Sequence, residues 1–349
     1  MIRANAYKVR DLVEEIFVRE NMSREDANIA ATALLDANLA GRDSHGFLRV
    51  KCYCDRLEQG GTDPRGEVEI ITETPTTAVI EGNNTLGLVA AMKAAQLTRK
   101  KALESGMACV LVRNGGHYGA GGYWSDIIGQ DDLITMNCSN TEALVVPFGG
   151  KDIALGTNPV SVYVPADKYG SICLDIATST VAQGKLFQYK LKHETLGTGW
   201  AVDAEGEATT DPDKAMFLTS FGEHKGYAIA VMIEAISAVL AGTAIGSHIN
   251  SLANDPGKTN NVSYCFMAMR VDAFRPVDDF RKDADALVEY LHSIPAAAGK
   301  RVLAPGEVEH ENRCDRLANG LPLPEDLVAQ LMSLAHKLDI SDPEDYFKL

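Results

Sequence analysis

A histidine, an arginine and a tyrosine follow one another at intervals of four residues in the first part of the chain. They are His45, Arg49 and Tyr53. In a helix, such positions lie on one face. An imidazole exchanges a proton near neutral pH, a guanidinium holds a carboxylate with two parallel hydrogen bonds, and a phenol orients either partner. The spacing predicts a site that binds a small carboxylate and moves a proton at a neighbouring oxygen, although such a stripe also occurs on solvated or interface faces.

A second candidate lies in the glycine-rich segment 115–122, which follows an apolar run typical of a buried strand. Its glycines are not spaced as in GxGxxG, and the chain contains neither a GxxxxGK[ST] nor an HExxH motif. Such a turn can bring backbone N–H groups close to a ligand, and it can equally be a loop or the entry to a helix. His117 has few side chains around it in this segment, so we expect it to face a cleft.

Two charged residues stand at the ends of predicted elements. Asp175 ends an apolar strand, where its carboxylate could accept hydrogen bonds from ribose hydroxyls or cap the following helix. Lys225 precedes the long apolar segment 227–245, where its ammonium could meet a phosphate or remain solvated. Glu234 in the middle of that segment favours a buried helix of a soluble protein over a membrane span.

Composition narrows the possible partners and compartments. The chain has 349 residues, 46% of them apolar and 23% charged, which predicts a soluble globular protein of about two domains. A net charge of −15 without any cluster of Lys or Arg disfavours nucleic acid and anionic membranes. The first residues have no apolar segment typical of a secretory signal, and the seven cysteines include no CxxC pair. We therefore expect a cytoplasmic protein without a disulfide framework or a metal site.

Periodicity and turn residues predict the elements. We expect helices over residues 7–19, 23–39 with Ser23 and Asp26 as a capping box, 44–59, 86–104, 278–293 and 324–338. We expect strands over residues 68–71, 77–80, 107–112, 133–138, 161–164, 172–176 and 264–271. Strands and helices do not alternate strictly, so a regular doubly wound parallel sheet is not indicated.

Taken together, the candidate residues belong to motifs that resemble those of the type-2 malate/L-lactate dehydrogenase family. This family includes ureidoglycolate dehydrogenase, 2,3-diketo-L-gulonate reductase and Δ1-piperideine-2-carboxylate reductase. The resemblance covers about residues 7 to 340. The matching motifs are Asp43-Ser44-His45-Gly46 with Arg49, Gly116-His117-Tyr118-Gly119, and the segments 145–150, 155–159, 175–179, 209–212, 224–227 and 305–307.

The resemblance implies an α+β fold with a nicotinamide-binding domain that is not a Rossmann domain. It implies a large mixed, mostly antiparallel sheet, a helical domain formed from both chain ends, and a homodimer. We expect a helical substrate and dimerisation domain over residues 1–75, a cofactor-binding sheet domain over 76–275, and C-terminal helices over 276–349 that return to the first domain. One departure stands out, because the family often has two glycines where this chain has Gly222-Glu223.

The resemblance also assigns roles to residues at matching positions. His45 and His117 match catalytic histidines, and Ser44, Arg49 and Tyr53 match positions around the substrate. The positions that match cofactor contacts are Thr141, Asp175, Ile176, Ala177, Lys225, Gly306 and Glu307.

These roles describe hydride transfer between NAD, or alternatively NADP, and C2 of a small 2-hydroxy or 2-oxo acid, of which malate is our first choice. Arg49 would hold the carboxylate. We favour His45 as the acid–base and His117 as its polarising partner, with the reverse assignment open.

Several alternatives remain at this point. Within the family they are ureidoglycolate dehydrogenase, lactate dehydrogenase and a reductase of cyclic imine carboxylates. Outside it they are a non-catalytic nucleotide-binding protein and a hydrolase built on Ser44 and His45. The hydrolase is disfavoured because adjacent helical residues diverge by about 100° and do not readily pair as nucleophile and base.

Overall fold

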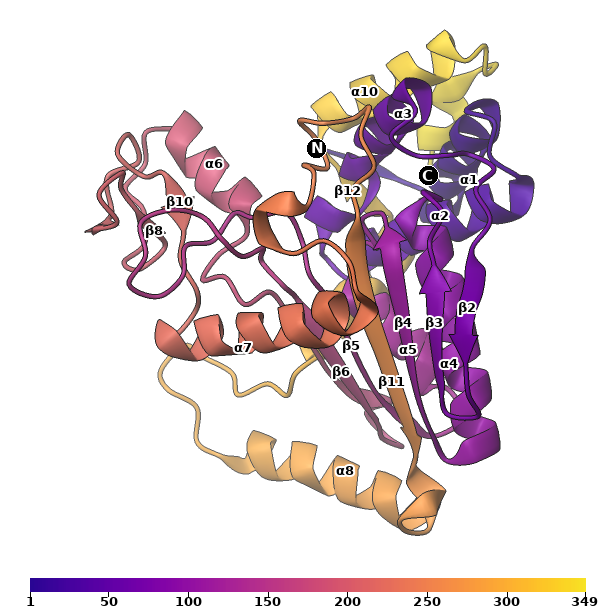
Figure 1. Ribbon diagram of the computed structural model, residues 1–349, viewed down its shortest axis with the longest axis vertical. Helices are drawn as coiled ribbons and strands as arrows, with labels where there is room; N and C mark the ends of the chain where they lie inside the picture. The colour runs from indigo at the N-terminus through magenta and orange to yellow at the C-terminus, as the bar shows by residue number, and fades with distance from the viewer.

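A seven-stranded mixed sheet forms the centre of the computed structural model, which describes residues 1–349 (Figure 1). Across the sheet the strands are β2 (Glu69–Glu73), β3 (Thr77–Glu81), β4 (Met107–Gly115), β11 (Val262–Arg270), β5 (Leu133–Ser139), β6 (Val160–Pro165) and β7 (Ser171–Ile176). Every neighbouring pair is antiparallel except β3 and β4, which are parallel and are connected through the helix α4 (Gly87–Ser105).

The middle of the sheet is occupied by β11, a strand from the last third of the chain. It pairs with β4 on one side and β5 on the other, so that Phe266 lies opposite both Val110 and Asn137. Most residues of β11 are buried, as expected for a strand covered on both faces. The chain after residue 261 is therefore needed to complete the sheet.

Helices cover both faces of the sheet (Figure 1). On one face, α4 contacts β4 and β11, and α5 (Gly121–Gly129) contacts β5 and β6. On the other face lie α7 (His224–Glu234) and the π-helical turn Ala235–Val239 that continues it, which contact β5, β4 and β11. A smaller lobe at the left of Figure 1 holds α6 (Gln183–Leu191) and a three-stranded sheet of β8 (Ala201–Val202), β9 (Ala208–Thr209) and β10 (Phe217–Leu218).

Both ends of the chain meet in a helical part above the sheet (Figure 1). It contains α1 (Ala6–Arg19), α2 (Arg24–Leu39), α3 (Val50–Gln59), α9 (Glu307–Asn319) and α10 (Glu325–Lys337), and the strand β1 (Ile2–Ala4) pairs with β12 (Leu321–Leu323). Helix α10 contacts α1 and α3, and α9 contacts α2. Helix α8 (Val277–Ser293) instead contacts β6, far from the other C-terminal helices in Figure 1.

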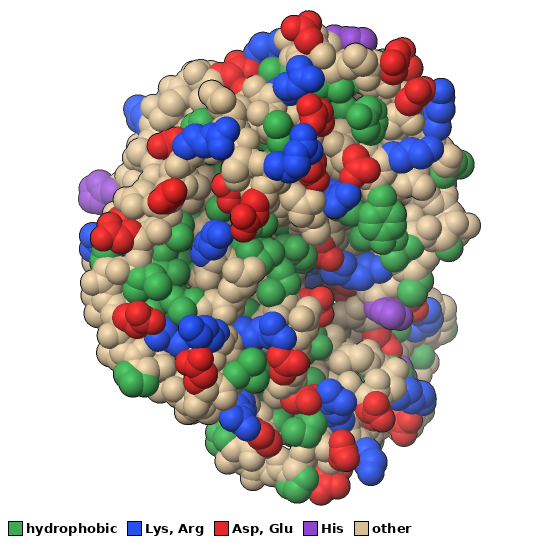
Figure 2. All heavy atoms as spheres, turned by 90° about the vertical axis from the view of Figure 1, so that its right-hand side faces the viewer, with side chains coloured by type: hydrophobic (Ala, Val, Ile, Leu, Met, Phe, Trp, Pro, Cys, Tyr) green, Lys and Arg blue, Asp and Glu red, His purple; other side chains and the backbone are tan.

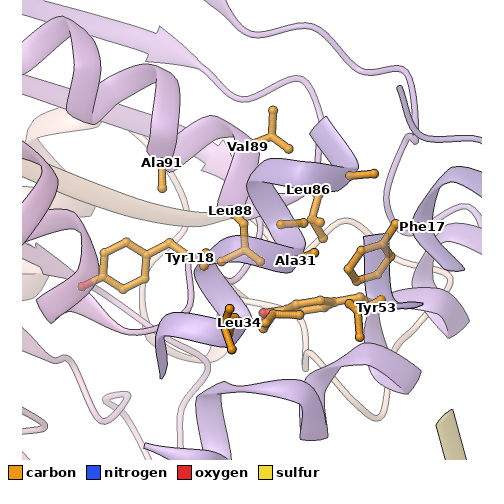
Figure 3. Close-up of a cluster of buried hydrophobic side chains, with 14 of the residues drawn as sticks. Phe17, Ala31, Leu34, Tyr53, Leu86, Leu88, Val89, Ala91 and Tyr118 are labelled. Atoms are coloured by element: carbon orange, nitrogen blue, oxygen red, sulfur yellow. The ribbon is translucent and has the colours of Figure 1, made fainter. Parts of the chain in front are cut away.

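One large apolar cluster joins the helical part to the sheet. Figure 3 shows members of it from α1, α2, α3 and α4, among them Phe17, Leu34, Tyr53 and Leu88. Each of these four side chains is at most 1% exposed. Burial of such large side chains is worth about 1.5–3 kcal/mol each, so this cluster fixes how the helices sit on the sheet.

Only half of the predicted capping box is present, because the Asp26 carboxylate accepts from Ser23 Oγ at 2.6 Å and not from the backbone N–H of Ser23. Ser23 precedes the first turn of α2, and its Oγ accepts a hydrogen bond from the backbone N–H of Asp26 at 3.1 Å. The predicted helix over residues 44–59 is wrong in its first turns, because α3 begins at Val50. Two 3₁₀ turns, Asp43–His45 and Phe47–Arg49, precede it, with Gly46 between them.

The physical reason for the interruption is a contact with α2. The backbone N–H of Phe47 donates to Oδ1 of Asn38 at 2.7 Å, and a Cβ at Gly46 would lie 2.2 Å from that same oxygen. The predicted common helical face of His45, Arg49 and Tyr53 therefore does not exist.

Charges of both signs are mixed over the face of the molecule shown in Figure 2. None of the helices has both the length and the apolar character that a membrane crossing requires. The apolar segment 227–245 forms α7 and the π turn, and Glu234 in it is 6% exposed. The expectation of a buried helix is correct for one side of this helix, whereas Met232 and Leu240 are 58% and 64% exposed.

A buried arginine ties α3 to a distant loop. The Arg56 side chain is 2% exposed, and its guanidinium donates to the carbonyl oxygens of Leu252 at 3.2 Å, Asp255 at 3.1 Å and Gly61 at 3.0 Å. It also donates to the carbonyl oxygen of Lys258. The planar fork of an arginine can reach several carbonyl oxygens at once, which an ammonium cannot.

We predict that Arg56→Lys lowers the free energy of unfolding by about 2–4 kcal/mol, because buried carbonyl oxygens lose their donors. Urea denaturation followed by circular dichroism at fixed protein concentration measures this. Arg24→Lys is the matched control, since Arg24 pairs at the surface with Glu14 and Glu15 and should cost less than about 1 kcal/mol. Equal losses in the two variants would contradict the assignment.

Candidate active site

Two imidazoles stack on each other where the helical part meets the sheet. The ring centroids of His45 and His117 lie 5.6 Å apart, with 24° between the ring planes. His45 comes from the first 3₁₀ turn before α3, and His117 from the connection between β4 and α5. Both are partly exposed. The structure thus brings the two histidines together, although His45 does not lie on the predicted helix.

Each imidazole has a hydroxyl group at its Nδ1 atom. Tyr53 Oη lies 2.7 Å from Nδ1 of His117, and Ser44 Oγ lies 3.0 Å from Nδ1 of His45. The Tyr53 side chain is 1% exposed, and its burial raises the pKa of the phenol well above its usual value. Tyr53 therefore stays protonated, and on both rings Nε2 is the nitrogen left for a ligand.

Arg49 supplies a positive charge beside these rings. Its Nε donates to the carbonyl oxygen of Ser44 at 2.8 Å, and its guanidinium forms no ion pair within the chain. Burial and the charge of Arg49 lower the pKa of both imidazoles, that of His45 to about 3 and that of His117 well below its usual value. Both imidazoles are therefore neutral at pH 7, and each has an unprotonated ring nitrogen that can accept a hydrogen bond.

Asp175 lies in a second group of polar residues, around Arg42. Arg42 Nη1 lies 2.9 Å from Oδ2 of Asp175 and donates to its carbonyl oxygen at 2.9 Å, while Nη2 donates to Glu309 at 3.0 Å. The expectation that Asp175 could cap the following helix is wrong, because its carboxylate accepts the backbone N–H of Gly122 at 2.9 Å, in the first turn of the earlier helix α5. Burial raises the pKa of Asp175, and Arg42 opposes that shift.

Arg42 was not predicted from the sequence as a site residue. The available signal was its position directly before Asp43-Ser44-His45. Asp175 also explains one glycine of the glycine-rich segment. A Cβ at Gly122 would lie 3.0 Å from Oδ2 of Asp175. The helix N-terminus can approach the carboxylate closely because that position is glycine.

Three chain segments with predicted cofactor contacts are linked by hydrogen bonds. The backbone N–H of Thr157 donates to Oγ1 of Thr141 at 3.0 Å, and its carbonyl oxygen accepts the backbone N–H of Thr178 at 2.8 Å. The Thr178 carbonyl accepts the backbone N–H of Phe221 at 2.9 Å. Residues 141, 175–177 and 225 therefore lie on segments that are held together.

The lysine of this group stands at a helix start. Lys225 is exposed in the first turn of α7 and forms no ion pair. Glu223 before it has φ 57°, in a region that favours glycine, which agrees with the glycine that the resembling family often has there. Ile176, which follows Asp175, is 39% exposed and offers an apolar surface, and Ala177 is half-buried beside it.

Gly306 and Glu307 follow a residue that pairs with β7, the last strand of the sheet. The carbonyl oxygen of Pro305 accepts the backbone N–H of Cys173 at 3.0 Å, and Gly306 has φ 99° at the start of α9. Glu307 accepts from the backbone N–H of Ala304 at 2.7 Å. Gly306 and Glu307 line a cavity of about 610 Å³. None of the other predicted site residues lines this cavity, but Arg42, which pairs with Asp175, does.

The polar groups of the predicted cofactor contacts fit an anionic dinucleotide. An unpaired lysine at the start of an 11-residue helix suits a phosphate, and hydroxyl and carboxylate groups suit ribose. The lysine is Lys225, the hydroxyl group is that of Thr141, and the carboxylate is that of Asp175.

Comparison with known proteins identifies the class. Residues 4–332 match the malate/L-lactate dehydrogenase family. The chain therefore belongs to this family and is a 2-hydroxy acid dehydrogenase, which confirms the resemblance found in the sequence.

Among its relatives, L-sulfolactate dehydrogenase of Methanocaldococcus jannaschii is 35% identical over 97% of this chain and 98% of the relative. The solved structure of that sulfolactate dehydrogenase superposes with a TM-score of 0.94 and 34% identity, covering 99% of this chain and 100% of the other. Malate dehydrogenase of Pyrococcus abyssi is 32% identical over 95% and 94% of the two chains. Ureidoglycolate dehydrogenase (NAD(+)) of Escherichia coli O157:H7 is 29% identical over 93% of each.

Removing the charge of Arg49 tests the electrostatics of the site. We predict that Arg49→Gln raises the pKa of both His45 and His117, because a nearby cation disfavours the imidazolium form. NMR titration of the imidazole C–H signals measures this. Arg42→Gln is the comparison variant and should raise the pKa of His45 alone, since only His45 feels that charge. Unchanged titration of both rings in Arg49→Gln would contradict the prediction.

Proposed function

We propose that the chain interconverts a dianionic 2-hydroxy acid and its 2-oxo acid with NAD, in the manner of a malate dehydrogenase. The observation that carries the proposal is a pair of stacked, neutral imidazoles beside a guanidinium that has no acidic partner of its own. Arg49 is partly exposed and has no counter-ion in the chain, so its guanidinium is free to bind an anion.

Arg49 is the proposed carboxylate ligand. Its Nε is engaged by the carbonyl oxygen of Ser44, which fixes the guanidinium and leaves the terminal nitrogens for two parallel hydrogen bonds. Such a clamp orients C2 of the substrate, as hydride transfer requires. The bound carboxylate also offsets the charge of Arg49, so that an imidazolium nearby becomes less unfavourable.

His117 is better supported than His45 as the acid–base, which reverses our sequence-based preference. In the oxidation direction, Nε2 of neutral His117 accepts the proton of the C2 hydroxyl, and the resulting imidazolium donates from Nδ1 to Tyr53 Oη, 2.7 Å away. Tyr53 is held rigidly in the core, whereas Ser44 at His45 is exposed. His45 then stacks against His117 and orients it.

The cofactor supplies the hydride acceptor at the nicotinamide ring when it is bound. The proposed contacts are Thr141, Asp175, Ile176, Ala177, Lys225, Gly306 and Glu307, on a domain without the Rossmann fingerprint. NAD is proposed ahead of NADP, and the E. coli relative is named as NAD(+)-dependent.

Malate is the first proposed substrate and sulfolactate the second. Both carry a 2-hydroxy carboxylate and a further anionic group, and the relatives compared above include enzymes named for each. A homodimer in the cytoplasm also remains a proposal. The exposed apolar side chains of Met232 in α7, and of Val239 and Leu240 shortly after it, support an association between subunits.

A substrate screen tests the function. We expect reduction of NAD⁺, measured by absorbance at 340 nm, with malate or sulfolactate, and slower reduction with lactate or ureidoglycolate, which lack the second anion. Each acid is assayed with NAD⁺ and with NADP⁺. Turnover with none of the four acids would refute the proposed function, and turnover of ureidoglycolate alone would replace the substrate.

Histidine substitutions test the mechanism. We predict that His117→Ala lowers kcat by about 10²–10⁴-fold because the proton acceptor is lost, and that His45→Ala lowers it less. Steady-state kinetics at saturating cofactor measures both, and circular dichroism checks folding. A larger loss in His45→Ala would restore the original assignment, and full activity in both variants would remove the imidazoles from the chemistry.

A further inference from the structure

Glu234 is a buried carboxylate to which the proposed mechanism assigns no role. It ends α7, is 6% exposed, and forms no ion pair. Its oxygens accept three hydrogen bonds, from Nδ2 of Asn158 at 2.8 Å, from Nδ2 of Asn140 at 3.1 Å and from the backbone N–H of Gly246 at 3.0 Å. Burying a carboxylate costs free energy unless donors surround it, so a chain that keeps one here must gain something from it.

The two asparagines extend the network to the chain segments of the proposed cofactor site. Asn158 Oδ1 accepts the backbone N–H of Thr141 at 3.2 Å, and Asn140 Oδ1 accepts the backbone N–H of Ser263 on β11 at 2.8 Å. Asn158 has φ 31°, so a side-chain network holds its backbone in an uncommon conformation.

The same network reaches the other two segments of that site. Thr157, directly before Asn158, accepts from Thr178, and Thr178 accepts from Phe221 before α7. Helix α7 itself begins with Lys225 at one end and carries Glu234 at the other. The π-helical turn Ala235–Val239 starts immediately after Glu234, and such turns are frequent at functional sites.

We propose that Glu234 is a positioning residue, which fixes the segments of Thr141, Asp175–Ala177 and Lys225 relative to one another and thereby sets the affinity for the dinucleotide. The inference rests on the proposed function, since it assigns these segments to the cofactor. Glu234 acts through Asn158 and Asn140 and touches neither the cofactor nor the substrate.

Substitution of Glu234 by glutamine tests this network. It has nearly the same shape as glutamate, but it replaces one acceptor oxygen by an NH₂ group that faces an N–H donor. The asparagines cannot turn to compensate, because Asn158 also donates to the carbonyl oxygen of Ala230 at 3.0 Å and Asn140 to that of Ala244 at 3.1 Å. At least one hydrogen bond of the network must therefore be lost.

We expect Glu234→Gln to raise the Kd for NADH, measured by fluorescence titration, by about tenfold. At saturating cofactor, kcat and the KM for the hydroxy acid should stay within about twofold of the wild type. Hydrogen exchange at the amides of Thr141 and Gly246 should become faster. Ser237→Ala is the matched control, because Ser237 is buried one turn further on and donates only to the carbonyl oxygen of Ile233 at 2.7 Å.

An unchanged Kd for NADH in a folded Glu234→Gln variant would overturn the proposal, as would equal effects in Ser237→Ala. If Glu234→Gln does not fold, Glu234→Asp decides by the same criterion, since it keeps the charge but withdraws the oxygens by one methylene. The wild type separates the two levels of inference. If it neither binds NADH nor turns over any acid, the proposed function fails and this proposal fails with it, whereas normal wild-type binding with an unaltered variant removes Glu234 alone.

Discussion

The hydrogen bond between Tyr53 Oη and Nδ1 of His117 connects the helical part of the molecule to the sheet at the proposed active site. Tyr53 belongs to α3 and is buried in the apolar cluster, so its hydroxyl cannot move without repacking the helices. His117 belongs to the connection that follows β4 in the sheet. The position of the imidazole is therefore set by how the helical part packs on α4 and the sheet, and the protonated phenol restricts which nitrogen faces a ligand.

Arg49 is a cation without an acidic partner in a strongly acidic chain. With a net charge of −15, most cations of the molecule have carboxylates nearby, and the structure contains many ion pairs at the surface. Arg49 has none, and together with burial it keeps both imidazoles neutral. An anionic substrate would therefore experience a local positive potential within a molecule whose overall field repels it. The attraction acts only at short range, where hydrogen-bond geometry selects the ligand.

The sequence predicted the strands of the central sheet and most helices at the chain ends, because apolar periodicity and caps such as Ser23 are local signals. Helix α9 was not predicted. It could not predict that β11 enters the middle of the sheet, since strand order depends on contacts between distant residues. At the site, the motifs identified His45 and His117 as partners, yet the helix assumed for His45 was wrong. The interruption at Gly46 comes from Asn38 on a different helix, and no local pattern encodes it. Arg42 and Glu234 were missed as site residues for the same reason, since their partners lie far away in the sequence.

Arg42 connects the turn that carries His45 to Asp175, a proposed cofactor contact. It directly precedes the turn that carries His45, and it reaches both the side chain and the carbonyl oxygen of Asp175 on β7. The pair is shielded, with the Asp175 side chain only 5% exposed, so it is not one of the surface ion pairs that contribute little. Hydride transfer needs the substrate and the nicotinamide at a fixed separation, and the proposed substrate ligands lie on the helical part while most proposed cofactor ligands lie on the sheet. A contact that joins His45 to Asp175 through one rigid guanidinium therefore constrains the distance on which the proposed chemistry depends.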